Sequence, residues 1–127
     1  MDSGEFSRTR RYLGRTQEQL AQLLSVSPKA IQSFEQGWRN IPAYVERQLL
    51  FLLFLKRPPL ENTPPCWEIR RCPTKTRRSC VAWELGAGHF CWFVNGTLCH
   101  GKAQKNWRDK IELCRQCEVF RAMVTAV

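Results

Sequence analysis

Seven cysteines are the residues of this chain best suited to chemistry, and all of them lie in its second half: Cys66, Cys72, Cys80, Cys91, Cys99, Cys114 and Cys117. A cysteine binds soft metals and reacts with oxidants as its thiolate. Cys114 and Cys117 are separated by two residues, a spacing that lets both thiolates reach one metal ion at the end of a helix or loop. The other spacings are longer and define no site by themselves.

Three kinds of chemistry fit this pattern. An iron–sulfur cluster, expected as a four-iron cluster, needs four thiolates and would leave three cysteines over. Zinc could occupy a four-cysteine site, or two sites if His89 or His100 supplied an eighth ligand. A metal-free switch would form a reversible disulfide between Cys114 and Cys117. We favour the cluster over zinc, and zinc over the switch.

For a single four-thiolate site the later cysteines are the favoured ligands. They share the more compact part of the sequence, and the first three cysteines cannot complete such a site alone. The favoured set is Cys91, Cys99, Cys114 and Cys117. The other possible ligands are Cys66, Cys72 and Cys80. The tryptophans that follow Cys66 and Cys91 are expected to pack in the core.

Positive charge extends over the whole chain, whose net charge is +9. Residues 1–57 contain nine Lys and Arg against five Asp and Glu, and residues 58–127 contain eleven against six. Such a field suits a polyanion such as DNA or RNA. The polar segment 1–12 does not resemble a signal peptide, and the apolar run 49–55 is short of the ~20 residues that span a bilayer. We therefore expect a cytoplasmic protein without a membrane partner, whose thiols stay reduced.

The first half predicts a series of short helices. Residues 1–6 are expected to be frayed, before a first helix over residues 7–13. Thr16 and Gln19 form a capping box that opens a helix ending near Leu24.

Two more helices follow in this half. Ser27 is the N-cap of a helix that begins at Pro28 and stops at Gly37. A single long helix, dense in Leu and Phe, then runs from Pro42 to roughly Arg57.

Four of the seven prolines lie in residues 58–65, so this segment cannot be helical and is expected to be a semi-rigid extended spacer. Beyond it the pattern is irregular, with one helix predicted over 107–119. The predicted fold is mainly α. A helix-turn-helix domain covers 7–57, a proline-rich linker covers 58–65, and a small irregular cysteine-rich domain of the metal-binding type covers 66–120.

The motif TQEQLAQLLSVS at 16–27, followed by Ile31 and by FEQG at 34–37, resembles the Xre/Cro repressor family over residues 7–57. Ala21 stands where that fold needs a small side chain, because two helices cross closely there. Ser25 stands where the family usually has a glycine in the left-handed conformation.

This resemblance implies binding to double-stranded DNA, with the second helix of the motif entering the major groove by its first residues. It assigns four residues to base edges: Pro28, Lys29, Gln32 and Ser33. It assigns Gln17 and Arg39 to phosphates. It also implies a homodimer, whose interface could be supplied by Leu49, Leu52, Leu53 and Phe54. Docking of the cysteine-rich half onto the same apolar surface is the alternative.

A Cys-Trp pair occurs at 66–67 and again at 91–92, and NGTLC at 95–99, Lys110 and CEVF at 117–120 complete a second pattern. Residues 66–120 resemble the two-CW cysteine-cluster domain, a small bacterial module appended to regulators and chemotaxis-type sensors. This resemblance implies sensing without specifying a metal.

Together these features predict a sequence-specific transcriptional regulator whose cysteine-rich domain binds an iron–sulfur cluster or another metal and senses redox state. The alternative is an antitoxin-like DNA-binding protein whose second half folds around structural zinc and docks a protein partner. An enzyme is not expected. The sequence contains no nucleophile–base pair, phosphate-binding loop or paired carboxylates in a suitable context.

Overall fold

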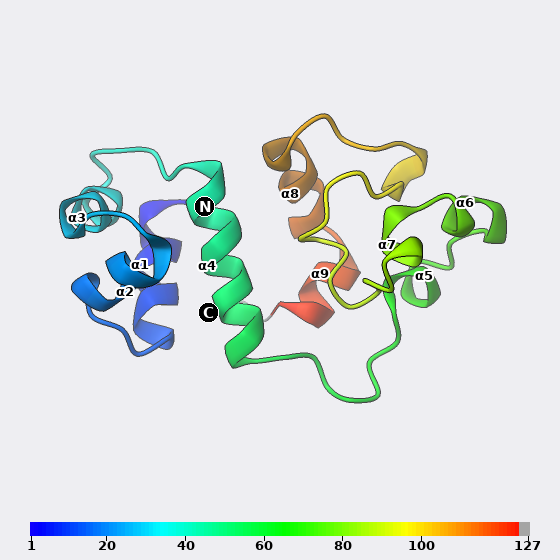
Figure 1. The fold of residues 1–127 in the computed structure, drawn as a ribbon, viewed down its shortest axis with the longest axis horizontal. Coiled ribbons are helices and arrows are strands. Elements are labelled where there is room, and N and C mark those ends of the chain that lie inside the picture. Colours follow the sequence, from blue (N-terminus) through cyan, green and yellow to red (C-terminus); the bar gives the residue numbers. More distant parts are fainter. Residues whose placement is uncertain (125–127) are drawn as a thin grey trace. The chain divides into compact units, whose positions relative to one another are not determined.

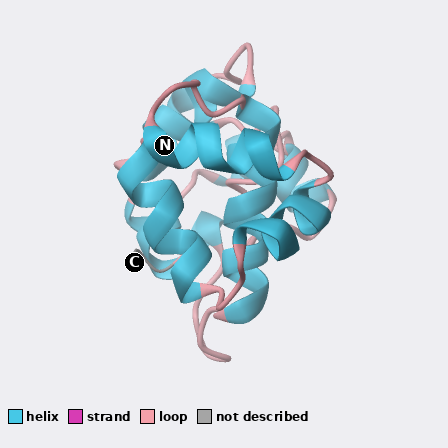
Figure 2. Cartoon of the chain, turned by 90° about the vertical axis from the view of Figure 1, so that its left-hand side faces the viewer, coloured by secondary structure: helices cyan, strands magenta, loops and turns pink. Residues whose placement is uncertain are grey.

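The computed structural model describes residues 1–124, and these form helices and loops without a strand (Figures 1 and 2). The mainly α prediction is confirmed. The described residues divide into two compact units, Met1–Arg57 and a second unit that begins at Pro58. No helix among residues 1–124 is both long and apolar enough to cross a membrane.

The first unit contains four helices, which are α1 (Ser3–Tyr12), α2 (Gln17–Leu24), α3 (Pro28–Gln36) and α4 (Ala43–Lys56). The helices α2 and α3 are joined by three residues (Figure 1). Both helices direct their apolar residues into one core together with α1 and the start of α4. The buried core residues are Phe6, Leu20, Ala21, Leu24, Ala30, Ile31, Phe34, Ile41, Val45 and Leu49.

The predicted helix caps are confirmed. The backbone N–H of Gln19 donates to Thr16 Oγ1 at 3.1 Å, and the N–H of Thr16 donates to Gln19 Oε1 at 3.0 Å. Ser27 Oγ accepts from the backbone of α3 at 3.1 Å, and Gly37 ends that helix at φ 76°. Ser25 ends α2 in the left-handed conformation, at φ 56°. That conformation costs a non-glycine residue about 1–2 kcal/mol.

The prediction that residues 1–6 are frayed is wrong. Asp2 caps α1 by accepting the Glu5 N–H at 2.8 Å, and Phe6 is fully buried. The terminal ammonium of Met1 donates to Glu46 at 2.9 Å. The interface predicted on α4 also needs a correction, because Leu49 belongs to the core of this unit.

The second unit is built from short helices, which are α5 (Cys66–Ile69), α6 (Thr74–Arg78), α7 (Val81–Glu84), the 3₁₀ helix η1 (Cys99–Gly101), α8 (Trp107–Arg115) and α9 (Glu118–Met123). The single helix predicted over 107–119 is wrong. The chain leaves α8 at Gln116, and Cys117 is extended, with φ −91° and ψ 136°. The break separates the CxxC thiols onto two elements instead of one helix face.

Aromatic rings form the core of the second unit. Trp92 is fully buried, and its ring lies 5.5 Å from that of Phe90 and 6.0 Å from that of Phe120, edge-on in both cases. Trp67 is half-buried and packs edge-on against the Trp83 ring at 4.9 Å. Core packing is therefore confirmed for Trp92, whereas Trp67 lies at the margin.

The proline-rich segment 58–65 contains no helix, as predicted, but it is not a uniformly extended spacer. A turn closes where the Thr63 N–H donates to Leu60 O at 2.9 Å. The carbonyl of Thr63 lies 2.6 Å from His89 Nε2, and the Cys66 N–H donates to Gly88 O at 2.7 Å. The end of this segment is thus held against Gly88 and His89 of the same unit.

Candidate metal centre and nucleic-acid interface

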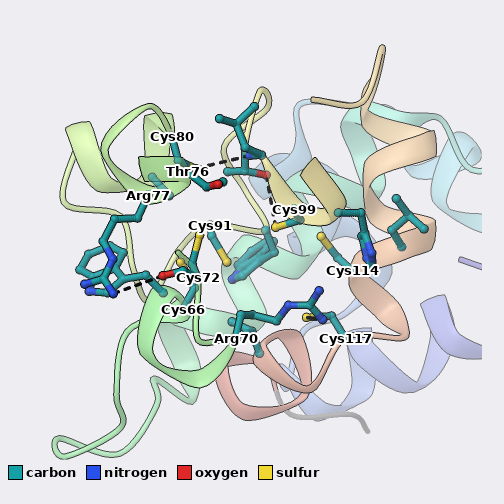
Figure 3. A pocket seen from close by; sticks show the side chains of 18 of the residues that line it. Cys66, Arg70, Cys72, Thr76, Arg77, Cys80, Cys91, Cys99, Cys114 and Cys117 are labelled. Carbon is teal, nitrogen blue, oxygen red and sulfur yellow. Dashed lines mark hydrogen bonds between the residues drawn. The ribbon is translucent and has the colours of Figure 1, made fainter. Parts of the chain in front are cut away.

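A cavity of about 300 Å³ lies within the second unit, and all seven cysteines line it. None of them is part of a disulfide. Figure 3 shows Cys66, Cys72 and Cys91 on one side of the hollow and Cys99, Cys114 and Cys117 on the other. Cysteines distributed over residues 66–117 thus line one cavity.

All cysteines except Cys114 reach the cavity from a turn, a loop or the end of a short element. Cys66 is the first residue of α5, Cys80 directly precedes α7, and Cys99 opens η1. Only Cys114 lies inside a helix of more than two turns. The many turns of this unit, which give the sequence its irregular pattern, are what allow so many thiols to face one volume.

Cys66 and Cys91 are linked by a hydrogen bond between their side chains. The Cys91 thiol donates a hydrogen bond to Cys66, which lowers the pKa of Cys66 although burial opposes this. The same hydrogen bond, together with burial, raises the pKa of Cys91. Cys66 is therefore the thiol of this pair that more readily becomes a thiolate.

The other thiols are linked to this pair by their electrostatic interactions. The pKa of Cys114 is raised to about 11, mainly by burial; Lys110 opposes the rise, and Cys99 and Cys117 add to it because like charges repel. Burial also raises the pKa of Cys72, and here the neighbours that add to the effect include Cys80. Seven thiolates could not share this cavity without a compensating positive charge.

The sulfur atoms of Cys80 and Cys117 accept hydrogen bonds from N–H groups. The backbone N–H of Leu98 donates to Cys80 Sγ at 3.4 Å, and Arg70 Nη1 donates to Cys117 Sγ at 3.9 Å. Hydrogen bonds of this kind stabilise thiolate sulfur and tune iron–sulfur clusters.

Basic side chains line the cavity, whereas no carboxylate does. Lys110 is only 4% exposed, and its Nζ donates to Thr97 Oγ1 at 2.5 Å. Arg77 Nη2 donates to the Cys72 carbonyl at 3.2 Å, and the guanidinium carbon lies 5.5 Å from the centre of the Trp83 ring. Its Nε is buried and has no hydrogen-bond partner among residues 1–124. The cavity thus combines thiols with cations.

The thiols are arranged around the cavity and do not meet at one point. Within the described part of the chain, no three His, Cys, Asp or Glu side chains converge closely enough to hold a metal ion. A single zinc needs four ligands within about 2.3 Å of one point. In a polynuclear cluster each thiolate binds a different iron, so the ligands surround the group and stand further apart. Thiols that line a cavity match the arrangement of ligands around a cluster.

The favoured ligands Cys91, Cys99, Cys114 and Cys117 all line the cavity, but so do the other possible ligands, Cys66, Cys72 and Cys80. In space the early and the late cysteines do not form two separate groups, because the thiol of Cys91 is hydrogen-bonded to Cys66. The residue that sequence reasoning missed is Arg77. Thr97 and Lys110 entered the sequence analysis only as part of a resemblance. Lys110 precedes Cys114 by four residues on a helix, and this spacing places both side chains on one face of the helix.

In the first unit, the residues expected at base edges lie along the first two turns of α3. Pro28, Lys29 and Gln32 are exposed, and Ser33 is half-buried. Arg39, in the loop after α3, is exposed and its guanidinium carbon lies 5.5 Å from the centre of the Phe34 ring.

Gln17, the remaining expected contact, has a partner that the sequence did not predict. Its side chain hydrogen-bonds to Glu35 on α3, which is also paired with Arg10 of α1. The second bond of that pair, Arg10 Nη2 to Glu35 Oε2, is 3.2 Å long. This network links the first turn of α2 to α3 and to α1.

Comparison with protein-family models, curated proteins and solved structures finds no match to this chain.

Proposed function

We propose that this protein is a sequence-specific DNA-binding transcriptional regulator whose cysteine-rich unit holds an iron–sulfur cluster and senses redox state. The observation that carries the proposal is the convergence of all seven thiols, with basic side chains and no carboxylate, on one cavity. The first unit supports it with exposed Pro28, Lys29 and Gln32 at the start of α3.

The DNA-binding part of the proposal treats α2 and α3 as a helix-turn-helix, in keeping with the resemblance to Xre/Cro repressors. In that geometry the first turn of the second helix reads bases, and the preceding helix crosses the phosphate backbone. Lys29 can donate to guanine, Gln32 can pair with adenine, and Arg39 can bind phosphate. A homodimer would present two such helices to the two halves of an operator.

Bound in the cavity, an iron–sulfur cluster supplies reversible electron transfer and sensitivity to oxidants. Four of the seven cysteines would hold it, and the Leu98 N–H and Arg70 would stabilise ligand sulfur. Trp67, Trp83 and Trp92 line the cavity and restrict the access of water. The short elements that carry the cysteines have little packing of their own, so release of the thiols would let this unit rearrange.

Anaerobic purification tests the cluster. The expected product is brown, contains iron and sulfide, and bleaches in air. Colourless protein with stoichiometric zinc would reject the cluster in favour of a structural zinc site.

Binding to a selected operator and to its scrambled version tests the DNA-binding part. Lys29→Ala and Gln32→Ala should reduce binding to the operator more than to the scrambled site, by about 1–3 kcal/mol of discrimination. Arg39→Ala should weaken binding to both alike, because a phosphate contact carries no sequence information. Equal losses on both sites for all three variants would contradict the assignment.

A further inference from the structure

Lys110 is a buried cation for which the fold supplies no anion. Among residues 1–124 it forms no ion pair with a carboxylate. All acidic residues of the second unit are exposed: Glu61, Glu68, Glu84, Asp109, Glu112 and Glu118. The hydrogen-bond partner of Lys110 is the neutral hydroxyl of Thr97, which is itself buried. A buried ammonium in such surroundings is costly unless a negative charge comes close.

The groups that can supply this negative charge are the thiols. Lys110 interacts electrostatically with Cys66, Cys91 and Cys114. It lies one helical turn before Cys114 on α8, so both side chains face the cavity. Lys110 is therefore adjacent to both sides of the thiol lining that Figure 3 shows.

We infer that Lys110 is the built-in counter-ion of this cavity, which takes an anionic metal–thiolate group whose stability and reduction potential this lysine sets. The inference rests on the proposed function and names a residue that acts on the same site. In an iron–sulfur cluster the thiolate ligands carry more negative charge than the core carries positive charge, so the whole is an anion. A nearby ammonium favours the reduced, more negative form. Lys110 is thus a positioning residue and not a ligand.

A set of variants separates the charge of Lys110 from its hydrogen bond. Lys110→Met removes both, Lys110→Arg keeps the charge, and Thr97→Val keeps the charge while removing the hydroxyl. Lys105→Met removes an exposed lysine outside the cavity lining and is the matched control. Each protein is reconstituted anaerobically with ferrous iron and sulfide, and its reduction potential is measured by dye-mediated titration.

We expect Lys110→Met to shift the potential to a more negative value and to weaken retention of iron against a chelator by about 10- to 100-fold. Lys110→Arg and Lys105→Met should remain near wild type in both measurements. Thr97→Val, which also removes the acceptor of the Cys99 Sγ–H at 3.9 Å, should change both less than Lys110→Met does. The metal-free proteins give a second readout. There Lys110→Met should raise the melting temperature of the second unit, because an uncompensated buried charge has been removed.

A purely structural lysine would give the opposite pattern. Thr97→Val would then behave like Lys110→Met, and both would lower the melting temperature of the metal-free protein; that result overturns the inference. An unshifted potential in a fully loaded Lys110→Met protein also overturns it, while the proposed cluster stands. If wild-type protein takes up no iron and sulfide, the proposed function itself fails and the inference fails with it.

Discussion

The thiol of Cys91 donates a hydrogen bond to Cys66, although α6, α7 and their connecting segments lie between the two residues in the sequence. The donated hydrogen favours the thiolate at Cys66 and, by the same contact, disfavours it at Cys91. Chemically similar thiols are thus made unequal by their position in the fold, and this inequality can be measured.

In the reduced, metal-free protein at neutral pH, Cys66 should react with iodoacetamide faster than Cys91 or Cys114. The reason is that alkylation needs the thiolate, whose fraction is larger where the pKa is lowered and smaller where it is raised. Mass spectrometry of peptides after short reaction times gives the three rates separately.

Replacing the donor provides the control for this prediction. Cys91→Ala should slow the alkylation of Cys66, whereas Cys117→Ala, which removes a thiol that does not lower the pKa of Cys66, should leave the rate unchanged. In denaturant the cysteines should react at similar rates. If Cys66 kept its rate in Cys91→Ala, its reactivity would have to come from exposure and not from the hydrogen bond.

The first unit should lose stability in acid through Glu35. Burial opposes ionisation of this carboxyl, but hydrogen bonds from Arg10, Ser7 and Gln17 outweigh it, so its pKa lies below the usual value. A lowered pKa means that the native state prefers the ionised form. The resulting stability is present above the unfolded-state pKa of ~4.3 and is lost as the pH falls through the lower, native value.

Glu35→Gln should therefore destabilise the first unit by about 2 kcal/mol at pH 7 and remove most of this acid sensitivity. Hydrogen exchange of peptides from residues 1–57, measured at pH 7 and in acid, reports on this unit alone. Glu18→Gln, at an exposed position of α2, is the matched control. Equal acid sensitivity in wild type and Glu35→Gln would show that another carboxyl is responsible.

The local elements of the first unit could be predicted because their signals lie within a few residues of one another. The capping box at Thr16 and Gln19, and the stop at Gly37, are set by the side chains and backbone of their own helix termini. The fraying predicted for residues 1–6 was wrong for a related reason. The contact between Met1 and Glu46 joins residues that are far apart in the sequence, so no local sequence pattern predicts it.

The site in the second unit was less accessible from the sequence. The residue types predicted thiol chemistry, but the assignment of Cys91 to the later cysteines overlooked its pairing with Cys66, which depends on how the turns between them fold. The break at Gln116 and Cys117 contains neither glycine nor proline. Tertiary packing overrode a helical pattern there, and so the predicted single helix became two.

Gly88 shows how tightly the fold controls the position of Cys66. Its carbonyl accepts the Cys66 N–H at 2.7 Å, and a Cβ at this position would lie 2.5 Å from Pro65 Cβ and 2.9 Å from the Trp67 ring. The space is therefore too small for any side chain, and Gly88→Ala must push the start of α5 away. We expect it to destabilise the second unit by about 1–3 kcal/mol and to weaken iron retention, because Cys66 moves with the backbone.

Urea unfolding and the chelator assay measure the two effects. The matched control is Gly4→Ala in α1, where the nearest atom to an added Cβ, Arg8 Nη1 at 3.1 Å, is the mobile end of a side chain. Alanine is the better helix former, so this variant should be as stable as wild type or slightly more stable. A Gly88→Ala protein that unfolds like wild type would mean that α5 can shift freely. The cavity would then hold Cys66 too loosely to distinguish it from the other thiols.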